Sequence, residues 1–523
     1  MKKYLLGFAA SVALLSAVPA QAVTFKWAND GDVRAMDPNT LDETVQNSFL
    51  GNIYEPLVRR NKKLEVEPAL AVSYKQTSPT VWTFKLRPNV KWQDGHAFTA
   101  DDVVFSFKRI TSKTSQTGGN VASVKEVRKI DDLTVEFETK APDPILPQAF
   151  TNWPMLPKHW MEANNSAEPV VIGTGENYAL RNAMGTGPFK LASREADRKS
   201  VLEKNPGWWD KPEHNLDRSE FNVITNAATR VAALLSGEMD MIYSVPPQDI
   251  ERLKAAEGIK VLQGPELRTI YLGMDVDRDE LLFSSVKGKN PFKDLRVRKA
   301  FLLAIDTDAI TKRVMRGQGF PLFEMWANGV NGYNKALDVR PKVDIPAAKK
   351  LLEEAGYKDG FTVTLDCSND RYIADEAICT AISSMLARIN VKVEVYARTK
   401  VKFFADIAYP GYKTSFYMLG WTPSTYDAAN VIGDHIASRS LKLSVGNVTG
   451  YSNARVDALI GMINQEIDPA KRQAQIDEVT KIVQAELPYI PLHQQGLTWA
   501  TRKNIDLVQP ADNTIPMRWV QVH

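Results

Sequence analysis

The loop at residues 420–427 holds side chains suited to bind a small polar molecule. It follows an apolar stretch and reads Gly-Trp-Thr-Pro-Ser-Thr-Tyr-Asp, with no formal charge before Asp427. Hydroxyl groups can hydrogen-bond to a neutral solute, and the indole of Trp421 can stack on an apolar face of it. Packing of Trp421 beneath the surface is an equally open interpretation. The candidate ligand-binding residues in this loop are Trp421, Thr422, Pro423, Ser424, Thr425 and Asp427.

A second candidate loop, Ser-Asn-Asp-Arg-Tyr at residues 368–372, contains Arg371. A guanidinium group can hold a carboxylate through two parallel hydrogen bonds. Alternatively, Arg371 pairs with an acidic neighbour at the start of the next helix, and both interpretations remain open. Those neighbours are Asp370, Asp375 and Glu376. Tyr271 completes the set of candidate ligand-binding residues.

Signatures of catalysis are missing from the sequence. The six histidines are scattered, without an HExxH motif or a pair at i,i+4, and this argues against a zinc hydrolase. Neither a G-x-S-x-G motif nor a phosphate-binding G-x-x-x-x-G-K-[ST] loop occurs. We therefore expect no catalytic residues, no metal site and no cofactor.

Residues 1–22 have the three parts of a secretory signal peptide. Lys2 and Lys3 precede an apolar stretch over residues 4–18, and Ala-Gln-Ala at residues 20–22 is typical of a cleavage site. The apolar stretch is shorter than the roughly 18 residues that cross a bilayer. We expect export to the periplasm, cleavage after Ala22 and no direct membrane insertion.

Removal of this leader removes the positive charges of Lys2 and Lys3 from a chain with a formal charge of +3, so the mature chain is close to neutral. Near-neutrality argues against nucleic acid or an anionic membrane as a partner. A mature chain of about 500 residues is expected to form several lobes rather than one core.

The chain has two cysteines, Cys367 and Cys379. An even number of cysteines in a chain expected to be exported is compatible with one disulfide. Two reduced, buried thiols are the alternative.

Alternating apolar residues predict strands in the first third of the chain. Apolar side chains alternate with polar ones over residues 82–86 and again over 135–138. Between them, Thr99 and Asp102 have the spacing of a helix cap and precede apolar residues at helical spacing. Residues 58–184 are therefore expected to form an α+β segment.

In the segment 361–420, stretches in which apolar and polar residues alternate are separated by stretches with apolar residues at helical spacing. This pattern predicts strand, helix, strand, helix, strand. The connections are long enough for parallel crossovers, and ligands collect beyond the carboxyl ends of strands in such sheets. The two candidate loops follow the first and third of these strands. Arg371 and Trp421 are thus expected at one edge of one sheet.

Two more helices are predicted in the second half of the chain. Asp294 precedes apolar residues at helical spacing over 297–304, and Pro346 and Gly356 bracket another helix.

A series of segments resembles the family-5 extracellular solute-binding proteins, whose best-known members deliver dipeptides and oligopeptides to ABC importers. The segments fall in the family's order along the mature chain. They are IYEPLV at 53, WTFKLRPNVKWQDGHAFTADDVVFSFKR at 82, GTGPFKL at 185, KNPGWWDKP at 204, LLSGEMDM at 234, NPFKDLRVRKAFLLAID at 290 and AAKKLLEEAGY at 347.

The resemblance implies an α/β, two-lobed periplasmic binding protein, hinged, with mixed sheets flanked by helices and an extra small α+β domain. By analogy, lobe I combines residues 23–57, 185–270 and 490–523. The small domain is 58–184, and lobe II is 271–489. The implied partners are a small-molecule or short-peptide ligand held between the lobes and an inner-membrane ABC permease, and we expect a monomer.

The family's peptide binders place an aspartate after the Gly-Trp pair, where it holds the α-ammonium of the peptide. The matching position here is Ser424. A hydrogen bond from an ammonium group to a carboxylate contributes about 1.5–3 kcal/mol, whereas one to a neutral hydroxyl contributes about 1 kcal/mol. Peptide binding is the first expectation, and an opine or an oligosaccharide is the alternative. A periplasmic hydrolase or chaperone is the alternative from another class.

Overall fold

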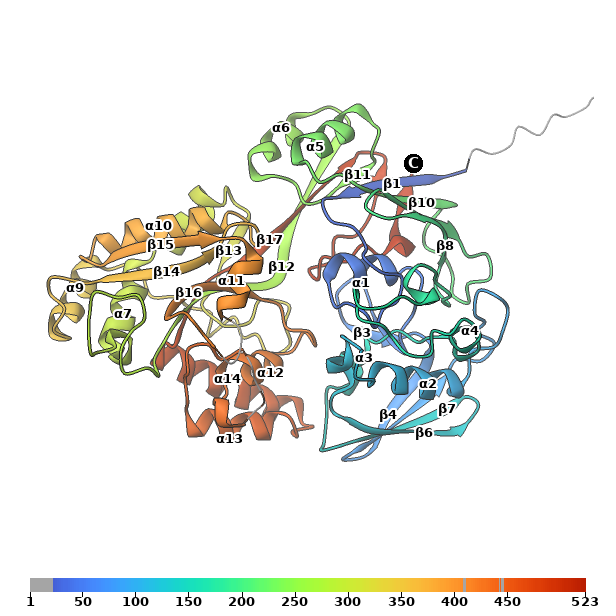
Figure 1. Cartoon of the computed structure of the whole chain (residues 1–523), viewed down its shortest axis with the longest axis horizontal. Helices are drawn as coiled ribbons and strands as arrows, with labels where there is room; N and C mark the ends of the chain where they lie inside the picture. The colour runs from blue at the N-terminus through green and yellow to red at the C-terminus, as the bar shows by residue number, and fades with distance from the viewer. Residues whose placement is uncertain (1–21, 408–410, 442, 444–445) are drawn as a thin grey trace, which may run out of the picture.

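Two long strands, β12 (Ile259–Met274) and β17 (Tyr489–Arg502), pair antiparallel and run from one lobe of the molecule into the other (Figure 1). The structure is a computed structural model that describes residues 22–407, 411–441, 443 and 446–523. Apart from Ala22, the predicted signal peptide lies outside the described residues.

The strands of both lobes form one sheet of eleven strands around this pair, with the order β15-β14-β16-β12-β17-β11-β1-β10-β9-β8 and with β13 beside β17. The strands other than β12 and β17 are β1 (Thr24–Asn29), β8 (Phe189–Glu195), β9 (Lys199–Lys204), β10 (Arg218–Val223), β11 (Met241–Ile242), β13 (Gly319–Pro321), β14 (Thr362–Ser368), β15 (Lys392–Arg398) and β16 (Phe416–Trp421).

The predicted lobe boundary at 270 falls inside β12. The β12–β17 ladder shifts register between Pro265 and Thr269, and Thr269 is the first residue of β12 that pairs with β16. A break in the ladder is a natural place for a strand pair to bend. We therefore propose that the hinge lies at 265–269, one to five residues before the predicted boundary.

The small domain has the predicted α+β architecture. Its sheet has the order β4-β5-β7-β6, and α2 (Ala100–Ile110) begins with the capping box that Thr99 and Asp102 predict. The strands are β4 (Ala71–Ser78), β5 (Val81–Leu86), β6 (Val124–Asp131) and β7 (Thr134–Thr139). The end of the predicted segment also serves lobe I, because residues 156, 161 and 179 pack into the lobe I core.

Lobe II confirms the predicted strand–helix alternation. Strand β14 lies between β15 and β16 and is parallel to both, with α10 (Asp375–Ala387) and α11 (Lys400–Ile407) as the crossovers. Asp294 caps α7 (Leu295–Ala304), and α9 (Ile345–Glu354) has its proline in the first turn. Two further helices, α13 (Ala454–Ile463) and α14 (Pro469–Glu486), pack on each other below this sheet (Figure 1).

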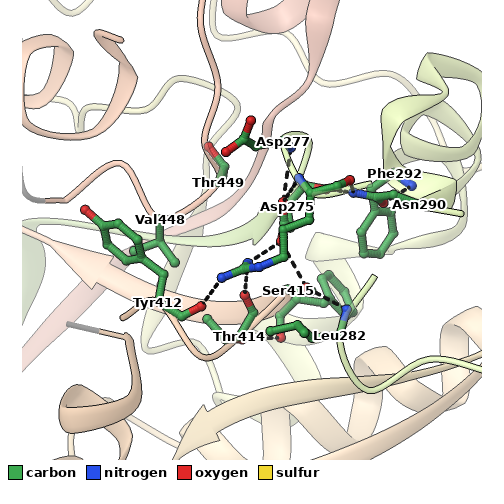
Figure 2. A network of polar contacts seen from close by, with 12 residues as sticks. Asp275, Asp277, Leu282, Asn290, Phe292, Tyr412, Thr414, Ser415, Val448 and Thr449 are labelled. Atoms are coloured by element: carbon green, nitrogen blue, oxygen red, sulfur yellow. Dashed lines mark hydrogen bonds and ion pairs between the residues drawn. The ribbon is translucent and has the colours of Figure 1, made fainter. Parts of the chain in front are cut away.

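A polar network fixes where β16 begins (Figure 2). The carboxylate of Asp275 accepts hydrogen bonds from Arg278 and from Ser415 Oγ, the latter at 3.0 Å. The backbone N–H of Asp275 donates to the carbonyl of Ser415, and Asn290 Nδ2 donates to the carbonyl of Asp275, at 2.8 and 2.9 Å. Because β16 leads directly into the candidate loop, this network sets the position of that loop.

Cys367 and Cys379 form a disulfide that joins the end of β14 to α10. Thiol titration of the denatured, unreduced protein is therefore expected to detect no free thiol, and titration after reduction to detect both. Two reactive thiols before reduction would contradict the bond. Because the bridge closes a short loop, its loss is expected to lower the free energy of unfolding by about 3 kcal/mol.

Candidate functional site

The two candidate loops meet at one edge of the lobe II sheet. Tyr372 follows β14, and its Oη donates a hydrogen bond to the carbonyl of Gly420 at 3.2 Å. A Cβ atom added to Gly420 would lie 2.7 Å from the Tyr372 ring, so only glycine allows this approach. Arg371 and Trp421 thus flank a fixed contact between the loops.

Arg371 is exposed, and its guanidinium makes no ion pair with the three acidic neighbours considered above. Asp375 instead accepts hydrogen bonds from Ser368 Oγ and from the N–H groups of Arg371 and Tyr372. Asp370 accepts one from the N–H of Lys400. Within the described residues, this leaves the guanidinium of Arg371 available for an external carboxylate.

A second arginine, Arg268 on β12, lies near Arg371, but an ion pair already balances its charge. Arg268 is 8 % exposed and pairs with Glu266 at 3.1 Å, and Gln495 Nε2 also donates to Glu266. Desolvation within the loop and the nearby charge of Arg268 lower the pKa of Arg371. The pair Arg268–Glu266 is thus internally balanced, whereas Arg371 forms no ion pair among the described residues.

Trp421 is half-buried at the end of β16. Its ring meets that of His435 edge to face with centroids 4.5 Å apart, and its Nε1 donates to Asn430 Oδ1 at 3.4 Å. Packing against His435 holds the indole, and the residue as a whole is partly exposed. The structure therefore supports a packing role for Trp421, and contact of its ring with a ligand stays a prediction.

We expect Trp421 to report ligand binding. Its partly open ring should change environment when a solute binds, so Trp421→Phe should lose most of the ligand-dependent change in intrinsic fluorescence. Trp160→Phe, a half-buried tryptophan of the small domain, is the matched control and should keep the change. A full response in Trp421→Phe would place the indole outside the site.

The outer part of the loop contacts residues of the small domain. The carbonyl of Ser424 accepts a hydrogen bond from Asn152 Nδ2 at 2.7 Å, and that of Thr425 accepts one from Arg60 Nη2 at 3.1 Å. Arg60 also lies over the Tyr426 ring at 4.2 Å. The hydroxyls of Thr422 and Thr425 are buried without a protein partner among the described residues.

A cavity of about 190 Å³ lies between lobe I, the small domain and Tyr426. Arg59, Arg60 and Arg518 line it, and each has one buried nitrogen without a protein partner in the described part of the chain. Arg59 is paired with Glu67 and Asp210, at 2.8 and 2.7 Å. The space beside the loop can therefore accept a polar group of a ligand.

Three predicted ligand contacts are buried in the structure, which argues against their direct contact with a ligand. Asp427 has no exposed surface, because its carboxylate caps α12 (Ala428–Val431) and accepts two hydrogen bonds of 2.8 Å from Arg472. Tyr271 is also fully buried, with its ring 5.3 Å from that of Tyr489 in the lobe II core. Pro423 is buried as well and offers no N–H group.

Asp434 is a further candidate site residue, which the sequence analysis does not identify. It follows α12 and is half-buried, and Asn430 Nδ2 donates to it at 2.9 Å. The side-chain oxygen of Asn430 in turn accepts from Trp421 Nε1 and from the N–H of Ser424. The i,i+4 spacing of Asn430 and Asp434 on a helical segment is the signal that could have revealed this link.

Asp434 should make stability depend on pH. Burial raises its pKa to about 6, so between pH 4 and pH 6 the folded state holds its proton more tightly than the unfolded state does. The resulting stabilisation is present below pH 4 and is lost as pH rises through 6. Asp434→Asn should therefore be more stable than the wild type at pH 7.5 by about 1–2 kcal/mol, allowing for solvent screening.

Urea unfolding at pH 4 and pH 7.5 measures this effect, and the two proteins should differ little at pH 4. A difference that is the same at both pH values would rule out the raised pKa.

Sequence comparison now identifies the family. The model of the bacterial extracellular solute-binding proteins, family 5, matches residues 65–437. The chain belongs to this family. Its members bind solutes and are not enzymes, and this agrees with the expected lack of catalytic residues. No described helix is both long enough and apolar enough to cross a membrane.

Relatives and solved structures match the chain over almost its full length. The glutathione-binding protein GsiB of Salmonella typhimurium is 26 % identical over 506 residues, covering 96 % of this chain and 94 % of the relative. DppA of Helicobacter pylori in complex with the peptide STSA has a TM-score of 0.76 at 22 % identity, covering 96 % and 98 %. AgaA of A. tumefaciens R10 in complex with agropinic acid has a TM-score of 0.75 at 22 % identity, covering 96 % and 99 %.

These matches show the periplasmic binding protein fold with the extra domain of family 5.

Proposed function

We propose that this family-5 solute-binding protein captures a small organic solute with a free carboxylate, with a short peptide as the first choice. The observation that carries the proposal is Arg371, an exposed residue whose guanidinium lacks an ionic partner among the described residues and whose neighbour Tyr372 donates a hydrogen bond to the carbonyl of Gly420. Arginine binds carboxylates well because its planar group donates two parallel hydrogen bonds. The neighbouring Arg268 cannot serve, because Glu266 already holds it.

The relatives support this class of ligand. The chain is similar to a glutathione-binding protein and to structures with a peptide and with agropinic acid. A peptide has one terminal carboxylate, and glutathione has two. An opine is the alternative to a peptide, because the hydroxyls of Thr422 and Thr425 lack a protein partner among the described residues and could bind neutral polar groups if the loop opens toward a ligand.

An amino group on the ligand requires a negative partner that Ser424 does not supply. Asp434 fits this role, because it is a half-buried carboxylate with a single side-chain partner and is joined through Asn430 to the loop. We assign the ammonium group of a peptide to this side of the loop and its carboxylate to Arg371.

The hinge strands supply the mechanism of capture. A ligand that touches both lobes binds more tightly when they close, and it shifts the population toward the closed form. Glu43, which caps α1 (Thr44–Leu50) in lobe I, already acts electrostatically on Arg371 of lobe II. The closed protein would then deliver its ligand in the periplasm to a membrane permease of an ABC importer.

A thermal-shift screen of the mature chain tests the proposal. The panel should hold dipeptides, tripeptides including glutathione, opines and neutral oligosaccharides, each acid paired with its amide where one exists. A ligand at 100 times its Kd stabilises the folded state by about 2.7 kcal/mol, which shifts the melting temperature measurably. We expect larger shifts from acids than from their amides at the same concentration. Shifts from neutral sugars alone would refute the proposal.

A further inference from the structure

A cluster on the small domain brings together two imidazoles and one carboxylate. The donor atoms of Asp94, His96 and His159 all lie within 4.8 Å of one another. His159 Nε2 is 2.7 Å from Asp94 Oδ2, and His96 Nδ1 is 3.1 Å from Asp94 Oδ1. The two imidazole rings have centroids 4.1 Å apart. The sequence does not reveal this cluster, because Asp94 and His159 are 65 positions apart.

The first two residues lie on a tight turn. The N–H of Gly95 donates to the carbonyl of Trp92 at 2.9 Å, and the N–H of Trp92 donates to the carbonyl of His96 at 2.8 Å. Gly95 has a φ of 94°, which glycine adopts without strain. The turn therefore holds the side chains of Asp94 and His96 close to each other.

The third residue, His159, lies on α4 (Lys158–Ala163), and one buried carboxylate ties this helix to the turn. Asp102 is 5 % exposed and accepts a hydrogen bond from Trp92 Nε1 at 3.2 Å. Its other oxygen accepts one from the N–H of Lys158 at 3.0 Å. The segments that carry the three donors are thus anchored at the same point, so the cluster is organised in advance.

We propose that Asp94, His96 and His159 form a binding site for a divalent cation of the zinc class. Two imidazole nitrogens and one carboxylate oxygen are a donor set that Zn²⁺ prefers, and three protein ligands leave a fourth position for water. Donors on a tetrahedral zinc ion lie about 3.3 Å apart. The present separations of 2.7 and 3.1 Å reach this value with small movements of the side chains.

The cluster is also accessible to an ion. The side chains of His96, His159 and Asp94 are 64 %, 33 % and 26 % exposed. This site lies on the small domain and is independent of the proposed solute, so it adds a second binding function to the chain. The proposal departs from the expectation of no metal site, which rests on the scattered histidines.

The chain offers a matched control at its end. His523 Nε2 lies 3.1 Å from Asp506 Oδ2, and both side chains are exposed, at 61 % and 65 %. This pair has one imidazole and one carboxylate but is not part of a three-donor cluster among the described residues. If exposure and a neighbouring carboxylate were sufficient for zinc binding, His523 would bind zinc as well.

Calorimetric titration of the mature, untagged chain with ZnCl₂ at pH 7.5, after removal of metal with EDTA, tests the site. We expect one equivalent to bind. His96→Ala and His159→Ala should each weaken binding at least about tenfold, comparable to the loss of a metal-site residue. His523→Ala and Arg371→Ala should leave binding unchanged. Circular dichroism of each metal-free variant verifies that it is folded.

Asp94→Asn keeps the size of the side chain and removes its charge, and we expect it to weaken zinc binding as well. If the wild type binds no zinc stoichiometrically, the three residues form only a hydrogen-bonded cluster and the proposal fails. It also fails if His96→Ala and His159→Ala bind zinc as tightly as the wild type, or if His523→Ala removes the binding.

Discussion

Arg371→Ala is expected to raise the Kd of carboxylate ligands about 10- to 100-fold. A hydrogen bond to a charged group contributes about 1.5–3 kcal/mol, and each 1.4 kcal/mol changes affinity tenfold. The amide of the same ligand should bind the variant and the wild type almost equally well. Isothermal titration calorimetry with each acid and its amide measures both effects.

Arg388→Ala is the matched control, because Arg388 is an exposed arginine at the end of α10 in the same lobe. It should bind both ligands like the wild type. Equal losses for the acid and the amide in Arg371→Ala would mean that the substitution disturbs the loop rather than a carboxylate contact. Arg371→Lys keeps the charge without the planar fork and should lie between the two.

Asp427→Ala is expected to have the largest effect on stability, lowering the free energy of unfolding by about 3–5 kcal/mol. The substitution leaves the Arg472 guanidinium buried without its carboxylate, removes the cap of α12 and frees Asn331 Nδ2, which lies 2.6 Å from Asp427 Oδ2. Denaturant unfolding of the variant and the wild type measures the loss.

Asp468→Ala separates capping from charge burial. Asp468 caps α14 but is exposed, so its loss should lower the free energy of unfolding by only about 1 kcal/mol. Adding Arg472→Met to Asp427→Ala should recover part of the stability, because no unpaired charge then remains buried. If Asp427→Ala is no more destabilising than Asp468→Ala, the ion pair contributes little.

Local patterns predicted the elements that position the site. Alternation, helical spacing and one apolar run between 361 and 420 were sufficient for these elements. β14, α10, β15 and α11 show a periodic pattern because each packs a face against a core, whereas β16 is an apolar run because it is buried on both faces. The same patterns place Arg371 and Trp421 at one sheet edge, since parallel strands end on the same side.

The roles of single side chains depend on partners that are distant in sequence. In the sequence, Asp427 has the character of a loop residue. Its buried ion pair depends on Arg472 of α14, which lies 45 positions further along the chain. Tyr271 is followed and preceded by apolar residues, and only the pairing of β12 with both β16 and β17 shows that it is enclosed. The cluster of Asp94, His96 and His159 is hidden for the same reason.

Small-angle X-ray scattering of the wild-type chain, with and without a saturating acid from the thermal-shift panel, tests the central claim most directly. The claim is that a carboxylate-bearing solute binds between the lobes and draws them together. We predict that the radius of gyration falls when the acid is added and falls less when the matched amide is added at the same concentration. A bound acid that leaves the radius of gyration unchanged would contradict this account.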